Sequence, residues 1–424
     1  MQLPKEFEEY TSNLMGGNLF AALKDSLDCP SPVSIRLNPF KTGTISPSDI
    51  AEALGAEGIE PVPWCNGGFY LPQRPSFTFD PLFHAGAYYV QEASSMFLDF
   101  VLRQLVSEPV TMLDLCAAPG GKSTCALAAL PKGSVLYSNE PIKNRASILT
   151  ENVIKFGHPD ITVTNNYAQD YLKARITFDV ILTDVPCSGE GMFRKDPNAV
   201  NEWSMQNVES CWKLQRSIVG DIWQCLRPGG ILIYSTCTFN AKEDEDNVSW
   251  IVDELGAEPV MLEGVRKEWN ITGALKGSLP VYRFIPGKTR GEGLFLAVLR
   301  KRDDGSCISG KANLTPLHIL SHGINPPMKK GKKIIPDISL ALSAKQEENK
   351  YPKIDVDYTT AINYLRREAI TLPDDAPRGI VTVCFNGFSL GFANNLGNRA
   401  NNLYPQEWRI KTTHVRTSAN GYGG

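Results

Sequence analysis

The chain has 424 residues, 42% hydrophobic and 21% charged, so we expect two or three soluble domains rather than one core. No run of 18 apolar residues occurs and the acidic first ten residues lack a signal-peptide core, which predicts a cytoplasmic protein without a membrane span. Net charge is −3, but residues 301–424 hold 17 Lys and Arg against 11 Asp and Glu, so the basic C-terminal end is where phosphate contacts are expected.

The ten cysteines form no C-x-x-C pair, and no Cys/His cluster has the spacing of zinc ligands. We therefore expect no metal. In a reducing cytosol the thiols are either core residues or nucleophiles. Most are interpreted as core residues because they carry no motif: Cys29, Cys65, Cys125, Cys211, Cys225, Cys307 and Cys384.

Four parts are predicted along the chain. Residues 1–105 are expected to form a mixed α/β domain, and residues 106–301 alternate short apolar strands with helical patterns, which is typical of a parallel α/β sheet. Residues 302–335 are rich in Gly, Ser, Pro and Lys without periodicity, which predicts a linker. Residues 336–424 are expected to form a small third domain.

Within the second part the strand candidates are Thr111–Leu115, Ser134–Ser138, Phe178–Thr183 and Gly230–Ser235, and the helix candidates are Lys143–Phe156 and Asn207–Cys225. Leu294–Leu299 is predicted to be a late, antiparallel edge strand. In the tail, Gly379–Phe385 and Phe388–Phe392 flank Asn386-Gly387, a dipeptide that favours a two-residue β-hairpin turn.

A nucleotide-binding loop is predicted after the first of these strands. Thr111–Ser123 contains an apolar strand, a glycine turn and the start of a helix, and Glu140 follows at the end of the next strand, where an acid can bind ribose hydroxyls. A phosphate-binding P-loop is disfavoured because Cys116 occupies its first glycine position, and no G-x-G-x-x-G is present. A nucleoside without a pyrophosphate, such as S-adenosylmethionine, fits this loop better.

Two cysteines follow buried strands. Asp184 and Cys187 follow the strand that begins at Phe178, and Cys237 follows the strand that begins at Gly230. Ligands of open α/β sheets bind at the carboxyl ends of the strands, so both cysteines should face the loop at residues 116–122.

A thiol at this place suits methylation of cytosine carbon 5, which is a poor nucleophile until a thiolate adds to carbon 6. An acid at the ring nitrogen, here Asp184, would stabilise the charge that develops. Lys122 is a candidate for the positive charge that favours a thiolate.

The motifs resemble those of the Sun-type RNA cytosine-5 methyltransferases. Asp114-x-Cys116-Ala-Ala-Pro-Gly-Gly-Lys122, Asp184-x-Pro-Cys187-Ser-Gly and Ser235-Thr-Cys237-Thr-Phe occur in that order. Arg283-Phe-x-Pro286 and Gly291-Glu-Gly293-Leu-Phe resemble the closing motif, although Gly287 stands where family members often have histidine.

The resemblance implies a Rossmann-like S-adenosylmethionine-dependent methyltransferase sheet, with Cys237 as nucleophile, Cys187 aiding product release and Asp184 contacting the base. It also implies a set of residues lining the S-adenosylmethionine pocket: Cys116, Ala117, Ala118, Pro119, Gly120, Gly121, Lys122, Glu140, Arg145, Asp170 and Asp184. Asp170 is expected at a strand end, where it would reach the adenine edge.

Resemblance extends to both ends of the chain. Ser34–Pro39 and Tyr89–Met96 resemble the family's N-terminal RNA-binding-like domain, and Gly189–Pro197 resembles the branch that methylates 16S ribosomal RNA. Gly391–Pro405 resembles the C-terminal PUA-like RNA-binding domain of RsmF-like members. The candidate RNA contacts are Arg36, Arg194, Lys195, Arg399, Lys411 and the lysine run at 329–333.

Three alternatives differ in their predictions. The core motifs scarcely separate a transfer RNA substrate from ribosomal RNA, whereas DNA methylation would make Cys187 the nucleophile and leave Cys237 idle. A non-catalytic RNA-binding assembly factor predicts damage at the nucleophile, the acid or the glycine loop, and all three are intact. The sequence specifies neither the cytidine modified nor whether assembled subunits are needed. A monomer is expected.

Overall fold

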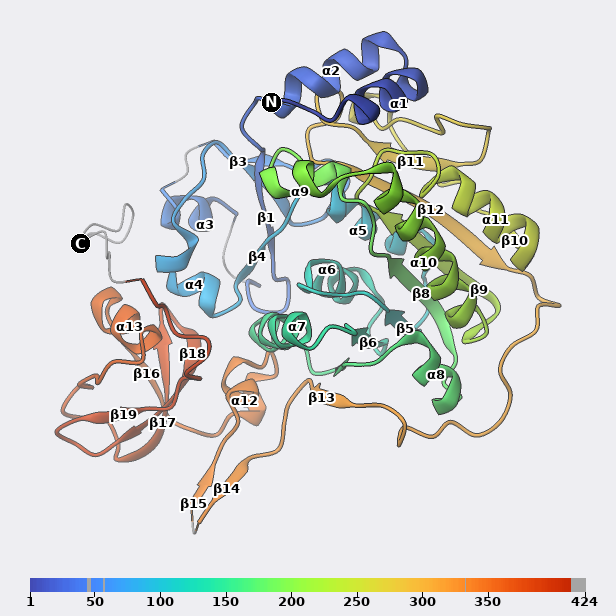
Figure 1. Ribbon diagram of the computed structural model, residues 1–424. Coiled ribbons are helices and arrows are strands. Elements are labelled where there is room, and N and C mark those ends of the chain that lie inside the picture. The colour runs from blue at the N-terminus through green and yellow to red at the C-terminus, as the bar shows by residue number, and fades with distance from the viewer. Residues whose placement is uncertain (44–46, 56–57, 332, 413–424) are drawn as a thin grey trace.

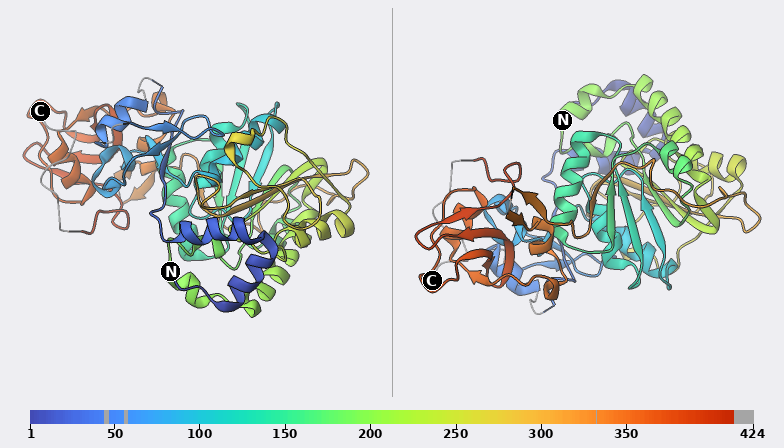
Figure 2. Two further views of the ribbon diagram at one scale, coloured as in Figure 1. Left: turned by 90° about the horizontal axis from the view of Figure 1, so that it is seen from above. Right: turned by 90° about the horizontal axis from the view of Figure 1, so that it is seen from below.

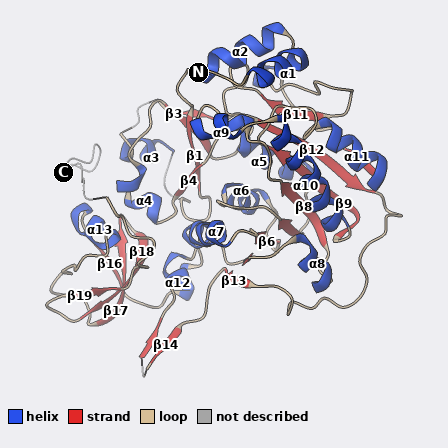
Figure 3. Ribbon diagram, in the orientation of Figure 1, coloured by secondary structure: helices blue, strands red, loops and turns tan. Residues whose placement is uncertain are grey.

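The computed structural model describes residues 1–43, 47–55, 58–331 and 333–412, and it has a large central sheet covered by helices, with a smaller sheet from each end of the chain beside it (Figure 1). Figure 3 shows the strands of the central sheet running side by side between helical layers. None of the helices in these ranges combines the length and apolar character needed to cross a bilayer.

The N-terminal part begins with two helices and continues into a four-stranded sheet of order β2-β3-β1-β4. Its elements are α1 (Lys5–Met15), α2 (Gly17–Leu27), β1 (Val33–Leu37), α3 (Pro47–Ala53), β2 (Glu60–Pro61), β3 (Gly68–Leu71), α4 (Pro81–His84), β4 (Tyr88–Val90) and α5 (Phe97–Leu105). Phe7 of α1 packs edge-on against Phe193 at 5.1 Å and Trp203 at 5.5 Å between ring centroids, so the first helices cover loops of the central domain.

The central sheet has the order β10-β12-β9-β8-β5-β6-β7-β13, with β11 paired to β12. Its strands are β5 (Thr111–Asp114), β6 (Val135–Asn139), β7 (Ile161–Thr164), β8 (Phe178–Asp184), β9 (Leu226–Thr236), β10 (Ala257–Pro259), β11 (Val281–Phe284), β12 (Leu294–Lys301) and β13 (Ile319–His322). The helices are α6 (Gly121–Ala129), α7 (Lys143–Phe156), α8 (Ala168–Ala174), α9 (Pro197–Glu202), α10 (Met205–Trp223) and α11 (Glu245–Leu255).

Both faces of this sheet are buried, which explains why its strands are continuous apolar runs. Met112 of β5 belongs to the cluster that includes residues of α5, α6 and α7, whereas its neighbour Leu113 belongs to the cluster that includes residues of α8, α10 and α11. Strands β7, β6, β5, β8 and β9 are parallel, and β12 pairs antiparallel with β9. The strands and the two helices predicted for this region are confirmed to within a few residues, and Leu294–Leu299 is antiparallel as predicted. Its predicted edge position is wrong, because β10 and β11 pair with the side of β12 that faces away from β9.

Residues 302–335 contain more structure than their composition predicted. Strand β13 pairs antiparallel with β7, with Ser321 opposite Val163 and His322 opposite Thr162, and so extends the central sheet. A short hairpin, β14 (Met328–Lys330) and β15 (Lys333–Ile335), then projects from the molecule (Figure 1). These strands are three or four residues long, which is too short for an alternation of apolar and polar residues to be recognised in a Gly- and Pro-rich segment.

The C-terminal part is a four-stranded sheet of order β16-β17-β18-β19. Its elements are α12 (Ile338–Leu342), β16 (Lys353–Asp355), α13 (Tyr358–Leu365), β17 (Gly379–Phe385), β18 (Phe388–Asn395) and β19 (Ala400–Asn402). The predicted hairpin is confirmed: Phe385 pairs with Phe388 around Asn386 (φ 49°) and Gly387 (φ 78°), both in the left-handed region that a type I′ turn requires.

The two ends of the chain share one hydrophobic core. Leu37, Leu82 and Tyr88 of the N-terminal sheet region cluster with Leu365 and Val381 of the C-terminal domain. Both views of Figure 2 show these two parts side by side next to the central sheet. The terminal domains therefore form a joint module rather than two separate appendages.

Candidate active site

The carboxyl end of β5 leads into a loop whose backbone turns sharply at Gly120. Gly120 has φ 111°, which favours glycine, and helix α6 begins directly after it at Gly121. The loop is held from both sides, because the backbone N–H of Ala117 donates to the Asn139 carbonyl at 2.8 Å and Arg145 Nη2 donates to the Ala118 carbonyl at 3.0 Å. The first backbone N–H groups of α6 therefore lie at the carboxyl ends of the parallel strands.

Two buried carboxylates near this loop have unused hydrogen-bonding capacity. Glu140 follows β6 and is 1% exposed; its Oε1 accepts the Ile142 N–H, and its Oε2 accepts no hydrogen bond, with Arg145 Nη2 at 3.5 Å. Asp114 Oδ1 likewise lacks a hydrogen-bond partner, and burial raises the pKa of Asp114 to about 7. A buried carboxylate oxygen without a donor fits a site for ligand hydroxyl groups.

Asp170 lies elsewhere than the sequence predicted. Strand β7 ends at Thr164, and Asp170 lies in the first turn of α8, not at a strand end. Its carboxylate accepts the Tyr167 N–H at 3.1 Å and pairs with Lys173 at 2.9 Å. The expected strand-end position was therefore wrong, because a polar turn and a helix cap separate Asp170 from the strand.

The two predicted cysteines meet at the carboxyl ends of adjacent strands. Cys187 follows β8 and Cys237 follows β9, and their sulfurs are 3.1 Å apart. The backbone N–H of Cys237 also points to the Cys187 sulfur at 3.4 Å. The hydrogen bond to the Cys237 sulfur, together with burial, raises the pKa of Cys187, which therefore stays a thiol and can donate to Cys237.

An ion pair lies beside them. Lys122 Nζ and Asp184 Oδ2 are 2.8 Å apart, and both side chains retain some exposure, 16% and 29%. Burial acts to lower the pKa of Lys122, but the Asp184 charge and hydrogen bond outweigh it, with Cys237 acting in the same direction, and the pKa is raised. Lys122 is thus an ammonium within electrostatic range of the Cys237 sulfur.

Two of the predicted RNA contacts are wrong because the side chains are buried. Arg36 is 1% exposed, and it donates to Gln91 Oε1 at 2.8 Å and to Thr124 Oγ1 of α6 at 2.6 Å. Arg194 has a side chain 7% exposed, which pairs with Glu292 at 3.0 Å. Both guanidinium groups stabilise contacts within the protein.

The other RNA candidates are accessible to different degrees. The Lys195 side chain is 34% exposed, and Arg399 and Lys411 are exposed. In the lysine run, Lys329 is exposed on the β14–β15 hairpin, and Lys332 lies outside the described residues.

The sequence reasoning missed the supporting role of Arg283. This residue is 1% exposed on β11, pairs with Asp244 at 2.9 Å and with Glu245, and donates to the Phe239 carbonyl at 3.0 Å. It thereby anchors the segment that follows Cys237. The available signal was an arginine inside the apolar strand Val281–Phe284, since a buried cation needs acidic partners.

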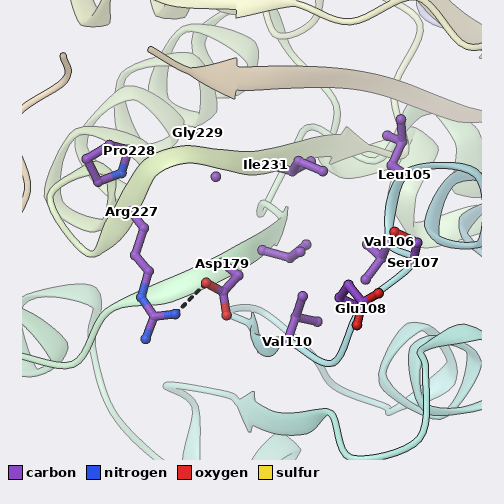
Figure 4. A pocket seen from close by; sticks show the side chains of 12 residues that line it. Leu105, Val106, Ser107, Glu108, Val110, Asp179, Arg227, Pro228, Gly229 and Ile231 are labelled. Atoms are coloured by element: carbon purple, nitrogen blue, oxygen red, sulfur yellow. Dashed lines mark hydrogen bonds and ion pairs between the residues drawn. The ribbon is translucent and has the colours of Figure 1, made fainter. Parts of the chain in front are cut away.

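A cavity lies at the opposite, amino-terminal ends of the strands. Its volume is about 300 Å³, and it is lined by the ends of α5, β8 and β9, with Arg227 and Asp179 paired at its wall (Figure 4). Asp179 lies near the start of β8 and Asp184 at its end, so this cavity is remote from the cysteines. No cysteine or histidine lines this cavity, so it offers neither of the nucleophilic sulfurs found at the carboxyl ends of the strands.

Three family models match the chain. Residues 104–300 match the 16S rRNA methyltransferase RsmB/F model, residues 3–93 match the N-terminal domain of 16S rRNA methyltransferase RsmF, and residues 351–410 match the methyltransferase RsmF PUA domain. These matches cover the central sheet and both terminal domains.

Named relatives and solved structures agree with these models. The chain is 31% identical to a ribosomal RNA small subunit methyltransferase F of Serratia proteamaculans, covering 74% of this chain and 68% of the relative, and 33% identical to one of Pectobacterium atrosepticum, covering 70% and 63%. It thus spans roughly two thirds of their length. A methyltransferase homolog protein from Pyrococcus horikoshii is 27% identical with a TM-score of 0.59, covering 70% of this chain and 95% of that one. NSun6 from the same organism with SFG, 22% identical with a TM-score of 0.60 over 71% and 99% of the chains, shares the fold.

Proposed function

The chain belongs to the RsmB/F family of ribosomal RNA methyltransferases, and on that premise we propose that it methylates carbon 5 of a cytidine in 16S ribosomal RNA through Cys237. The observation that carries the proposal is the 3.1 Å separation of the Cys187 and Cys237 sulfurs beside the Lys122–Asp184 ion pair. When bound, S-adenosylmethionine supplies the electrophilic methyl group.

Catalysis begins with the Cys237 thiolate adding to cytosine carbon 6, which moves an electron pair to carbon 5. The Lys122 ammonium favours the thiolate, and Asp184 contacts the ring nitrogen where charge develops. After carbon 5 has taken the methyl group, its proton is lost to a base, the ring double bond re-forms and the carbon–sulfur bond breaks. The Cys187 thiol hydrogen-bonds to the departing Cys237 sulfur and so assists product release, which its raised pKa supports.

The cofactor is proposed to lie along the loop after β5. Glu140 would bind the ribose hydroxyls, which the donor-free Oε2 of this buried side chain supports. Arg145 contributes by holding both Glu140 and the Ala118 carbonyl. The full proposed set is Cys116, Ala117, Ala118, Pro119, Gly120, Gly121, Lys122, Glu140, Arg145, Asp170 and Asp184.

RNA recognition is assigned to the terminal domains and to exposed cations. We propose a division into residues 1–105, 106–301, 302–335 and 336–424, in which strand β13 of the third segment joins the central sheet. Lys195 and Arg399 are proposed as phosphate contacts. The protein is proposed to act as a cytoplasmic monomer without a metal. Mapping the methylated position on 30S subunits, naked 16S RNA and transfer RNA tests the substrate; methylation of transfer RNA alone would contradict ribosomal RNA.

The roles of the two cysteines are separable by replacing each with alanine. Each variant is incubated with ribosomal RNA and S-adenosylmethionine and run on a denaturing gel. Cys187→Ala should give a persistent covalent RNA–protein band, because addition proceeds while release is impaired. Cys237→Ala should give none. The reverse pattern would make Cys187 the nucleophile.

A further inference from the structure

A buried carboxylate from the Cys187 loop holds the segment that follows Cys237. Glu190 lies three residues after Cys187 and is fully buried. Its Oε2 accepts the backbone N–H groups of Phe239 at 2.8 Å and Asn240 at 3.0 Å. One side chain thus spans from the end of β8 to the loop after β9.

A second carboxylate makes the same connection in the opposite direction. Glu243, from the Cys237 side, accepts the backbone N–H of Ser188 at 3.0 Å and the Gln215 side-chain amide at 2.7 Å. The Asn240 side-chain amide joins the two acids, donating to Glu190 Oε1 at 3.0 Å and to Glu243 Oε1 at 2.7 Å. We call Glu190, Asn240 and Glu243 the carboxylate clasp.

The clasp lies directly behind the two sulfurs. Gly191, next to Glu190, donates its N–H to the Cys237 carbonyl at 2.8 Å, and the Ser188 and Thr238 hydroxyls are 3.0 Å apart. The residue that follows each cysteine is therefore bonded to the opposite loop. Strands β8 and β9 pair as far as Asp184 and Ser235, and beyond that point these cross-links hold the two cysteine loops together.

We propose that the carboxylate clasp is a positioning device that sets the separation of the Cys187 and Cys237 sulfurs, with Glu190 as its principal positioning residue. Its catalytic consequence rests on the proposed function: the clasp keeps the Cys187 thiol within hydrogen-bonding distance of Cys237 during product release. The geometric part of the inference is independent of the substrate.

The position requires an acid because every group around Glu190 is a donor. Its Oε1 also accepts the Trp203 indole N–H at 2.9 Å, so each oxygen receives two N–H groups. Among the described residues Glu190 forms no ion pair with a lysine or arginine. In Glu190→Gln the amide NH₂ faces two donors in either orientation, which opposes the observed packing although the size is unchanged.

The distance can be tested without RNA by oxidising the folded protein with diamide. Two thiols become a disulfide as their hydrogens reduce the diazene, and peptide mapping by mass spectrometry follows the Cys187–Cys237 crosslink. We expect the crosslinking rate to fall at least about tenfold in Glu190→Gln and by less in Asn240→Ala, which leaves the backbone bonds to Glu190 in place. Equal rates in all three proteins would overturn the proposal.

Asp179→Asn is the matched control, since Asp179 lies at the far end of β8. It should crosslink at the wild-type rate, as should Glu190→Gln after denaturation in urea. S-adenosylmethionine binding, measured by calorimetry, should stay within about twofold of wild type in Glu190→Gln. If that variant is unfolded by circular dichroism, Asn240→Ala takes its place: a crosslinking rate below that of wild type supports the proposal, and the wild-type rate overturns it.

A catalytic measurement separates positioning from a loss of folded protein. If the clasp positions Cys187, the ratio of RNA–protein adduct to methylated product at steady state should rise in Glu190→Gln, toward that of Cys187→Ala. A purely structural role would lower adduct and product together and leave the ratio unchanged, which would contradict the proposal. If wild type forms neither product nor adduct, the proposed function fails, and the crosslinking result still tests the geometry.

Discussion

Glu243 links the active-site loops to the pH dependence of stability. Burial, followed by the Glu190 charge, raises the pKa of Glu243 from 4.5 to about 7. A carboxyl group whose pKa is raised by folding stabilises the protein fully below its unfolded pKa, and this contribution is lost as the pH rises through about 7. A shift of this size corresponds to roughly 3 kcal/mol.

Glu243→Gln should therefore flatten the pH dependence of the free energy of unfolding between about pH 5 and 8. Urea denaturation across this range measures it. A parallel loss of stability with pH in both proteins would show that Glu243 ionises normally.

At single residues, the sequence predicted which side chains meet at the strand ends better than it predicted which side chains are exposed. Cys187, Cys237 and Asp184 were identified because each follows an apolar strand in a parallel sheet, a topology that brings strand ends together. Arg36 and Arg194 were misassigned since an arginine that bonds Gln91 or Glu292 inside the protein has the same local sequence character as one that binds phosphate. Their acceptors come from distant segments, which no local pattern reveals.

At the level of elements, the close approach of helix α2 explains why glycine stands at position 287, where the family's closing motif often has histidine. It has φ +86°, and a Cβ there would lie 2.1 Å from the Ala22 carbonyl of α2. Gly287→Ala should thus destabilise the protein by more than the roughly 1–2 kcal/mol of left-handed strain alone, because α2 must move. A histidine here would make the same clash through its Cβ, so α2 of this chain would have to move to admit it.

Gly256→Ala is the matched comparison for this prediction. Gly256 has φ +70°, and an added Cβ meets nothing within 4 Å. In thermal unfolding, the unfolding temperature should fall less for Gly256→Ala than for Gly287→Ala. Equal decreases in unfolding temperature would mean that α2 moves aside without loss of stability, so that backbone strain alone accounts for the effect.

Elements with long apolar runs were predictable, and short pairing segments were not. Strands buried on both faces, such as β8, and helix α7, with its 14 residues, have enough apolar positions for their period to be read. Strand β13 forms by pairing with the edge strand β7, and its own sequence has no clear strand pattern. Pairing between segments so far apart in the sequence depends on the tertiary structure, so a local pattern does not predict it.

For the whole molecule, the shared core predicts that the C-terminal domain stabilises the N-terminal one. Tyr358 of α13 donates to the Phe79 carbonyl at 3.0 Å, and Leu365 packs in one cluster with Leu82. Removing residues 336–424 should expose that apolar surface, lower the unfolding temperature and promote aggregation. Hydrogen exchange should show faster exchange in residues 77–90, and unchanged protection there would mean that the N-terminal domain folds alone.

That shared core also bears on how the chain is made. Residues near Phe79 leave the ribosome about 280 residues before their partners near Tyr358, so the first domain must wait with an apolar face uncovered while the central sheet is synthesised. Contacts between segments so far apart close slowly, since the entropy of the intervening loop is lost before they form. A segment translated late thus completes the core of one translated early, and a chaperone that shields early apolar surface would be most useful during that interval.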